Sequence, residues 1–596
     1  MKIKFLKRAI KLVWDNARYW VLTSIFVSLI KGFLPLAFLW VTKLLIDEVS
    51  NVLVDSSSDY KMLFFLLFLQ FVLYVFQSSI QNLKEIIDTD AELKIDLQVG
   101  KLTAKKSINV PYSTFELPEF FYHHNRIKGD YGSKVLSPIK SAFSIVEFSI
   151  SLLSLLGFLL LYHWILVLIS ILTAIPILLI KSKFGNKKFH LLRYQTPSAR
   201  ESNYLRELLH DRSAAKEVRI FDIGTSLIHR WESISSKNNK EMLHLLKKQK
   251  FAYIALDAVS SFFYGVTALV LIWLIHSGMI KKIGDFVALG QAFLGAQNSI
   301  NMISTNLARI YEESLYIEDL FNYLDYSDKS KAHVNFSINK DFPTPLKKGI
   351  YIKNLQFNYP GSEKPALKGV NITIKTGEKI AIVGENGSGK TTLVKCILGL
   401  YQPTVGQIFF DEVESSNINL NQLWGKFTVI FQDFIRYPFS VRDNIAFGDI
   451  KNYDDWNKLV EVSKTIGIDD LINSWKEGFS TKLGKILYEG RDLSGGQWQK
   501  IGLARAIFRN SEIFILDEPT AAVDPKTEVE IFSKFNELTS NKTSIIVTHR
   551  MAAAKLADRI LVMKDGELVE EGTHEELMLS RSEYFHMFNV QSKWYE

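Results

Sequence analysis

The sequence predicts a multidomain chain in which an all-α membrane domain of six helices precedes a soluble α/β domain. Three observations support this prediction. The long apolar runs lie almost entirely before residue 325. From residue 349 onward, short β-branched runs alternate with helical segments, as in an α/β domain. A chain of 596 residues is also too long for one compact domain.

The predicted organisation has four parts. Residues 1–18 form a basic amphipathic elbow helix, 19–325 the membrane domain with long cytoplasmic helix extensions, 326–348 a linker, and 349–596 the α/β domain. The first part leads directly into a long apolar span, and no cleavable signal peptide is expected there.

Two features of the composition exclude whole classes of protein. Cys396 is the only cysteine, which excludes an intrachain disulfide and any metal site built from several cysteines, and its position after an apolar helical run predicts a core residue. The formal charge of +8 does not indicate nucleic acid, because Lys and Arg gather beside the apolar runs. We therefore expect membrane lipid, and no nucleic acid, among the partners.

Six apolar segments are long enough to cross a membrane. A helix that crosses about 30 Å of hydrocarbon needs roughly 20 mostly apolar residues. The candidate spans are about 19–46, 62–83, 140–161, 165–181, 253–276 and 286–308. Only His163 and Trp164 interrupt the third and fourth spans, which predicts a very short outer turn. The sixth is the least apolar, because it contains Gln291, Gln297, Asn298 and Asn301.

The distribution of positive charge predicts the orientation of the spans. Sixteen Lys or Arg residues lie between Lys181 and Lys250, whereas the loops assigned to the outside contain only Lys61, Lys281 and Lys282. Both ends of the membrane domain are therefore expected in the cytoplasm. About 55 residues separate spans two and three, and about 70 separate spans four and five. The helical periodicity of these two connecting stretches predicts that the membrane helices continue into the cytoplasm.

Three charged residues lie within or beside the spans. Lys31 is near the middle of the first span, where a charge is costly and faces a polar cavity or a partner, unless a tilted helix lets it reach the interface. Glu147 and Asp257 are weaker candidates for a substrate pathway, because each could sit in a cytoplasmic extension of its helix.

A glycine-rich turn marks the start of the α/β domain. The run KIAIVGENGSGKTTLVKCILGL reads as strand, turn and helix, and its Gly384, Gly389, Lys390 and Thr391 fit the phosphate-loop spacing G-x-x-x-x-G-K-[ST]. Backbone N–H groups and the helix N-terminus would hold the phosphates, Lys390 would reach the β- and γ-phosphates, and Thr391 would offer a hydroxyl to Mg²⁺. The expected binding residues are Gly384, Glu385, Asn386, Gly387, Ser388, Gly389, Lys390, Thr391 and Thr392.

Two carboxylates end a later apolar strand. Ile513–Leu516 is followed by Asp517 and Glu518, and ligands in parallel α/β sheets bind at the carboxyl ends of the strands. Asp517 would hold the magnesium directly or through water, while Glu518 would act as general base on the attacking water. With the phosphate loop, these residues indicate a phosphate-loop NTPase.

The pentapeptide LSGGQ at 493–497 narrows the class. Here the sequence resembles the ATP-binding cassette (ABC) superfamily, whose signature is this pentapeptide. The other family motifs follow in the family's order: Tyr359 in FNYP as the aromatic that stacks on adenine, Gln432 in FQDF as the Q-loop, Asp524 as the D-loop and His549 as the switch histidine. Six spans ahead of one cassette resemble an exporter-type half-transporter, which implies a transmembrane domain followed by a P-loop ATPase (nucleotide-binding) domain.

The resemblance implies a dimer that binds ATP and Mg²⁺. Glu518, Gln432 and His549 would be the catalytic residues, and Thr391, Gln432 and Asp517 the metal ligands. In this family the signature residues Ser494, Gly495, Gly496 and Gln497 serve the partner's nucleotide, so two chains facing head to tail complete two sites. This chain carries every element, which favours a homodimer, and a heterodimer remains open.

The resemblance also identifies two stretches that would connect the domains. Residues 115–122 and 211–221 resemble coupling helices that dock on the nucleotide-binding domain near Gln432, the alternative being an ordinary solvated helical face. ATP between two cassettes would favour their closed arrangement, and hydrolysis would release it. The membrane domains would thereby alternate between inward and outward openings.

The cargo is indicated only by finer resemblance. Trp498 follows LSGGQ where a basic residue is usual, and FQDFIRYPFSVRDNIAFGD with AAKEVRIF resembles bacterial exporters of lanthipeptides and other peptides. The glutamate usual in the segment before LSGGQ is displaced, since this chain reads ILYEGRD, so no role in cross-talk is assigned to Glu489. The resemblance to peptide exporters predicts export of a peptide across the cytoplasmic membrane of a bacterium. A multidrug or lipid exporter is the alternative, followed by an importer of similar fold.

Overall fold

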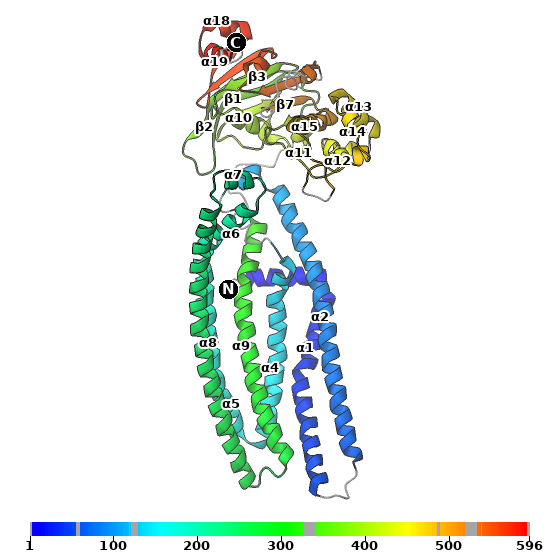
Figure 1. Cartoon of the computed structure of the whole chain (residues 1–596), viewed down its shortest axis with the longest axis vertical. Coiled ribbons are helices and arrows are strands. Elements are labelled where there is room, and N and C mark those ends of the chain that lie inside the picture. The colour runs from blue at the N-terminus through cyan, green and yellow to red at the C-terminus, as the bar shows by residue number, and fades with distance from the viewer. Residues whose placement is uncertain are drawn as a thin grey trace. The chain divides into compact units, whose positions relative to one another are not determined.

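The computed structural model describes residues 3–54, 60–117, 120, 129–326, 340–485, 489–518, 533–537 and 539–592. The chain divides into two compact units (Figure 1). One comprises Met1–Asn109 and Glu119–Tyr326, the other Val110–Pro118 and Ser327–Glu596. The second unit therefore includes a short piece of chain that lies, in sequence, between two helices of the first.

Among the described residues of the first unit, the regular secondary structure is all helical. Its helices are α1 (Ile3–Val54), α2 (Lys61–Asn109), α4 (Tyr131–Tyr162), α5 (Trp164–Tyr194), α6 (Thr196–His210), α7 (Ala215–Ile220), α8 (Gly224–His276) and α9 (Ile283–Asp325). The backbone of α1 kinks at Ala17, where the predicted elbow gives way to the first span. Each predicted span falls inside one long helix, and α2 and α8 extend well beyond theirs.

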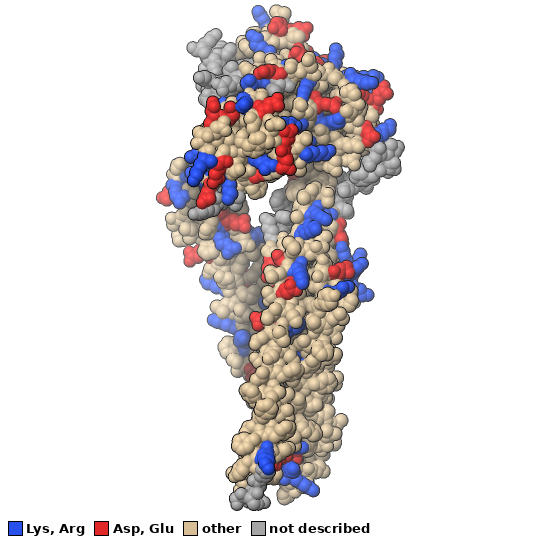
Figure 2. Space-filling view, turned by 90° about the vertical axis from the view of Figure 1, so that its right-hand side faces the viewer, with Lys and Arg blue, Asp and Glu red and all other residues tan. Residues whose placement is uncertain are grey.

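Five of these helices, α1, α2, α4, α5 and α8, are apolar and long enough to cross a membrane. The face of the helical unit seen in Figure 2 has a long stretch almost without charged side chains. The sixth predicted span lies in α9, which is diluted by polar residues. Those at Gln297, Ser299 and Asn306 are buried, and Ser299 Oγ lies 3.2 Å from Ser151 Oγ on α4. Gln291 and Asn298 are exposed, so only part of the polar groups of α9 faces other helices.

Charged groups join three helices at their predicted outer ends. Lys43 Nζ of α1 lies 2.7 Å from Asp285 Oδ1 of α9 and 2.9 Å from the hydroxyl of Tyr162 of α4. The Tyr162 hydroxyl donates to the same carboxylate at 2.5 Å. Beside them the Gly284 N–H donates to Asp47 Oδ1 at 2.9 Å. This pairing offsets the cost of placing charges at the end of an apolar bundle.

Lys31 also has partners on neighbouring helices. Its ammonium donates to Gln81 Oε1 of α2 at 2.5 Å and lies 4.0 Å from Glu147 of α4. Asp257, by contrast, is exposed on α8. Of the alternatives for Lys31, the geometry favours a charge paired inside the bundle.

Helices α2 and α4 approach each other closely at Gly132. A Cβ on that residue would lie 2.2 Å from the carbonyl oxygen of Glu92. One turn further along α2, Asp96 Oδ1 accepts the N–H groups of Tyr131 at 2.9 Å and Gly132 at 3.2 Å. A side chain of one helix thus caps the N-terminus of the other, and glycine permits the contact.

We predict that Gly132→Ala separates α2 from α4 and destabilises the protein. Overpacking of this kind costs about 1–3 kcal/mol, which should appear as a lower melting temperature of the detergent-purified protein. Gly157→Ala, on the same helix, is the matched control, because its Cβ would meet nothing within 4 Å. That variant should be neutral or more stable by about 0.5–1 kcal/mol. Equal melting temperatures for the two variants would contradict the packing argument.

The second unit is built on two sheets. One has the order β2 (Pro365–Lys375), β1 (Gly349–Asn358), β4 (Val405–Phe410) and β5 (Val413–Glu414), all antiparallel. The other has the order β10 (Glu567–Gly572), β9 (Arg559–Lys564), β3 (Lys379–Gly384), β8 (Thr543–Val547), β7 (Ile513–Asp517) and β6 (Phe427–Ile430). In this second sheet, the strands β9, β3, β8, β7 and β6 are parallel to one another, as the alternation of strands and helices predicts.

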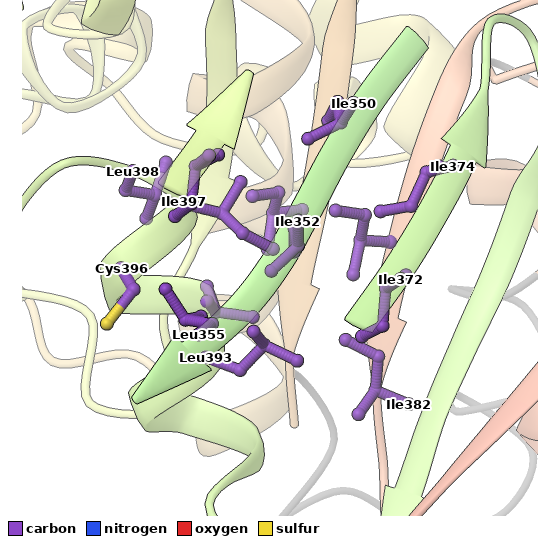
Figure 3. Packing of buried hydrophobic residues seen from close by; sticks show 14 of the residues in the cluster. Ile350, Ile352, Leu355, Ile372, Ile374, Ile382, Leu393, Cys396, Ile397 and Leu398 are labelled. Carbon is purple, nitrogen blue, oxygen red and sulfur yellow. The ribbon is translucent and has the colours of Figure 1, made fainter. Parts of the chain in front are cut away.

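Helix α10 (Lys390–Ile397) packs between the sheets. Figure 3 shows Leu393 and Ile397 beside Ile352 and Leu355 of β1. Cys396 is buried in the same core, as its position in the sequence predicts, and burial raises the pKa of its thiol to about 12. This core fixes the helix that follows the glycine-rich turn.

A separate group of helices carries the signature motif. Helices α12 (Val441–Ala446), α13 (Trp456–Ile466), α14 (Asp469–Asn473) and α15 (Gly495–Arg509) share a second hydrophobic core. Trp498, the departure from the usual basic residue, is 2 % exposed within this core. Packing therefore explains the tryptophan in this chain.

The piece of chain that joins the second unit contains the short helix η1 (Tyr112–Glu116). It contacts Tyr401 and Lys395, and Thr114 is fully buried. Of the predicted coupling stretch 115–122, residues 118, 119, 121 and 122 lie outside the described part. In the other stretch, α7 has no buried residue. Docking of either near Gln432 stays a prediction.

Candidate nucleotide site

The glycine-rich turn after β3 has the shape of a phosphate cradle. Gly384 has φ of +153°, and a Cβ there would lie 2.2 Å from the carbonyl oxygen of Met563, so only glycine fits. Ser388 Oγ is buried and has no hydrogen-bond partner among the described residues. Glu385, Asn386 and Gly387 are exposed at the tip of the loop. An unpaired buried hydroxyl at a helix N-terminus suits a bound phosphate.

Lys390 lies across the base of this loop. Its ammonium donates to the carbonyl oxygens of Gly384 at 2.8 Å and Glu385 at 2.9 Å. Burial lowers the pKa of Lys390, while the charges of Glu518 and Asp517 raise it. A phosphate in the loop would supply the negative charge that favours the ammonium form.

Thr391 and Asp517 meet at the base of the loop although 126 positions separate them. Thr391 Oγ1 donates to Asp517 Oδ1 at 3.3 Å. Burial raises the pKa of Asp517 to about 6, the hydrogen bond from Thr391 being the next largest influence and acting to lower it. A cation beside this carboxylate would relieve the cost of burying its charge, and hydroxyl and carboxylate oxygens are ligands that suit Mg²⁺.

The protein alone offers few metal ligands here. Among the described residues, no group of three or more His, Cys, Asp and Glu side chains could hold a metal ion. Magnesium commonly binds through one or two protein groups together with phosphates and water. Thr391 and Asp517 therefore fit a cation that arrives with the nucleotide.

Glu518, Gln432 and His549 form the other half of the site. Gln432 Nε2 donates to Glu518 Oε2 at 3.0 Å, and His549 Nδ1 lies 3.4 Å from Glu518 Oε1. Glu518 has φ of +45°, and its N–H donates to the carbonyl of Val547 at 2.9 Å. The carboxylate is thus oriented from both sides by residues of two other segments.

Tyr359 lies beside the loop helix. Its hydroxyl is 2.8 Å from Thr392 Oγ1, and its ring meets Tyr401 edge-on with centroids 5.6 Å apart. The structure therefore places this aromatic next to the phosphate loop, and its stacking on adenine stays a prediction.

The signature residues occupy a helix N-terminus of their own. Ser494 caps α15 and forms a capping box with Gln497, with Gly495 and Gly496 as the first helical residues. The N–H groups of this first turn can bind an anion that is presented from outside. The D-loop residue Asp524 lies outside the described residues.

Two residues near the site were not singled out from the sequence. Tyr401 and Lys395 contact the segment 110–118, which is remote in sequence. A buried aromatic and a helix-end lysine carry no motif, so the sequence alone offered no signal for them.

Comparison with known proteins agrees with this architecture. Residues 140–299 match the family model for the ABC transporter transmembrane region, and residues 367–521 match that for the ABC transporter. The chain is similar in fold to a bacterial Atm1-family ABC exporter with ATP bound, with a TM-score of 0.76 and 19% identity over 96% of this chain and 98% of that one.

Three curated relatives extend the comparison. The subtilin transport ATP-binding protein SpaT of Bacillus subtilis is 30% identical over 97% of this chain and 92% of its own length. The nisin transport ATP-binding protein NisT of Lactococcus lactis subsp. lactis is 30% identical over 97% and 95%. An ATP-dependent lipid A-core flippase of Syntrophus aciditrophicus is 29% identical over 79% and 74%. The predicted resemblance is confirmed: the chain belongs to the ABC transporter family, as a membrane-spanning transporter that hydrolyses ATP.

Proposed function

We propose that the protein uses ATP hydrolysis to export a modified peptide of the lanthipeptide class across the cytoplasmic membrane. The observation that carries this proposal is the similarity to the subtilin and nisin transport proteins, which extends over nearly the full length of each chain. The flippase relatives match over a smaller share, about four-fifths of this chain. They make lipid export the second candidate.

A polar cavity in the membrane unit suits a peptide cargo. About 370 Å³ of space lies among α5, α8 and α9, at the predicted cytoplasmic ends of their spans. Its lining combines Lys181, Arg309 and Glu313 with the aromatic rings of Phe184 and Tyr253. Both signs of charge beside aromatic rings suit the side chains and amides of a peptide. A charged lipid headgroup could also bind there, so the transport assay below separates the two candidates.

The residues of the candidate nucleotide site would hold ATP as follows. Thr391, Asp517 and Gln432 would hold Mg²⁺, which would neutralise charge on the β- and γ-phosphates. Residues 384–392 would bind the phosphates, with Lys390 turning from the loop carbonyls toward them. Tyr359 would stack on the adenine.

Glu518 would take a proton from the attacking water. Gln432 and His549, at 3.0 and 3.4 Å from its two oxygens, would orient the carboxylate. The signature residues of the same chain lie on a separate helix, α15. The γ-phosphate would therefore have to contact both the Glu518 cluster and a set of signature residues for the site to close.

A head-to-tail dimer would complete each site. Ser494, Gly495, Gly496 and Gln497 of one chain would face the phosphate loop of its partner. Because one chain carries a full set of motifs, a homodimer needs no second gene product. A heterodimer would use the same surfaces.

The role of Glu518 as base predicts a separation of binding from hydrolysis. Glu518→Gln should bind ATP as the parent does and lose steady-state hydrolysis by about 10²–10⁴-fold, the usual contribution of a general base. Radiolabelled ATP binding and phosphate release would measure the two steps. Glu567→Gln, an exposed glutamate on β10, is the control. Near-normal turnover in Glu518→Gln would remove Glu518 from this role.

The shared site predicts complementation between two inactive chains. Lys390→Ala and Ser494→Arg should each abolish ATPase activity as homodimers. Co-expressed with different affinity tags and purified through both, they should form one intact site from the Lys390 of one chain and the Ser494 of the other. Phosphate release should then recover to at most about half of the parent rate. No recovery in a purified mixed dimer would argue that each chain completes its own site.

Transport into inside-out membrane vesicles tests the cargo. We expect ATP-dependent uptake of fluorescently labelled nisin precursor peptide in vesicles that contain the parent protein, and none with Glu518→Gln. A fluorescent phospholipid, followed by dithionite quenching, tests the second candidate in the same vesicles. Lipid translocation without peptide uptake would replace the peptide proposal by a flippase.

A further inference from the structure

The segment 110–118 belongs to the nucleotide-binding unit although it lies between membrane helices α2 and α4 in sequence. Its short helix η1 presents Tyr112 and Glu116 to one residue, Tyr401. The Tyr401 hydroxyl donates to the carboxylate of Glu116, and the two tyrosine rings lie 5.6 Å apart. With only 1 % of its surface exposed, Tyr401 makes this contact inside the core.

On its other side, Tyr401 contacts Phe357 and Tyr359, and Tyr359 is the residue expected to stack on the nucleotide base. Its ring stacks on Phe357 at 4.9 Å with an interplanar angle of 21°. It meets Tyr359 edge-on at 5.6 Å, and the hydroxyl of Tyr359 lies 2.8 Å from Thr392 Oγ1 of the loop helix. An unbroken series of contacts thus runs from the phosphate-loop helix to the segment 110–118.

Lys395 makes a second connection from the same helix. Its ammonium lies 5.4 Å from the ring centroids of both Tyr112 and Tyr401. Cation–π contacts of this kind depend on where the ring faces point. A turn of the Tyr401 ring would therefore change its contacts with the loop helix and with η1 together.

We propose that Tyr401 is a positioning residue that transmits nucleotide occupancy to the segment 110–118 through its hydrogen bond to Glu116. The proposal rests on the proposed stacking of adenine on Tyr359. A base on Tyr359 restricts that ring, Tyr359 restricts Tyr401 by direct packing, and the hydroxyl of Tyr401 then holds Glu116 in one position. Because η1 belongs to the chain between α2 and α4, a change in its position would act on these two membrane helices.

Hydrogen exchange in the full-length protein tests this proposal without any cargo. The protein is reconstituted in lipid nanodiscs in the Glu518→Gln background, so that bound ATP persists. We expect Mg-ATP to slow amide exchange across residues 110–117. In Tyr401→Phe, which retains the ring and removes the hydroxyl, ATP binding should stay within about twofold while this protection falls by about tenfold, the scale of one hydrogen bond to a charged group.

Matched variants separate transmission from general damage. Glu116→Ala should lose the same protection, and adding Tyr401→Phe to it should cause no further loss, because the two residues share one bond. Tyr453→Phe removes another tyrosine hydroxyl that donates to a carboxylate, that of Asp443, and should leave the protection unchanged. Unchanged protection in Tyr401→Phe, additive losses in the double variant, or lost ATP binding would each overturn the proposal.

The stacking role of Tyr359 is checked separately. Tyr359→Ala should weaken ATP binding, and an unchanged affinity would remove the assigned base contact whatever Tyr401→Phe shows. If the vesicles show no peptide transport while the ATP-dependent slowing of amide exchange is intact, only the proposal of a peptide cargo fails. The two proposals therefore fail by different measurements.

Discussion

The nucleotide site depends on one packing constraint, the approach of the β3 turn to β9 at Gly384. The carbonyl oxygen of Met563 leaves no room for a side chain on that residue. The loop can therefore curl back on itself, with Lys390 bonded to its two first carbonyls. Helix α10 begins at that lysine, and its buried face then seals the core between the sheets. A chain that could not make this turn would lose the cradle and the start of the helix together.

Burial gives the site its chemical character. Asp517 ends a strand whose residues are all buried, so its charge is expensive without a cation, and its pKa rises to about 6. Glu518, the next residue, leaves the strand with positive φ and points toward Gln432 and His549. One change of backbone direction thus separates a residue suited to holding a cation from one suited to accepting a proton.

In the membrane unit, the cost of burying charged groups is offset by partners on other helices. Lys43, Tyr162 and Asp285 satisfy one another at one end of the bundle, and Lys31 reaches Gln81 and Glu147 further along. Of the polar side chains in the sixth span, Gln297 and Ser299 are buried among other helices, whereas Gln291 and Asn298 are exposed. By length and hydropathy five of the described helices qualify as membrane spans, and the sixth predicted span lies in the long, more polar helix α9.

The sequence by itself determined the order of the spans, the strand–loop–helix of the phosphate loop and the identity of the motif residues, because those signals are local along the chain. Only the tertiary structure decided that Gln432, Glu518 and His549 meet within 3.4 Å, that Trp498 fills a helical core, and that Tyr401 bonds a segment 285 positions away. Such contacts depend on how sheets and helices pack, and periodicity along the chain carries no record of them.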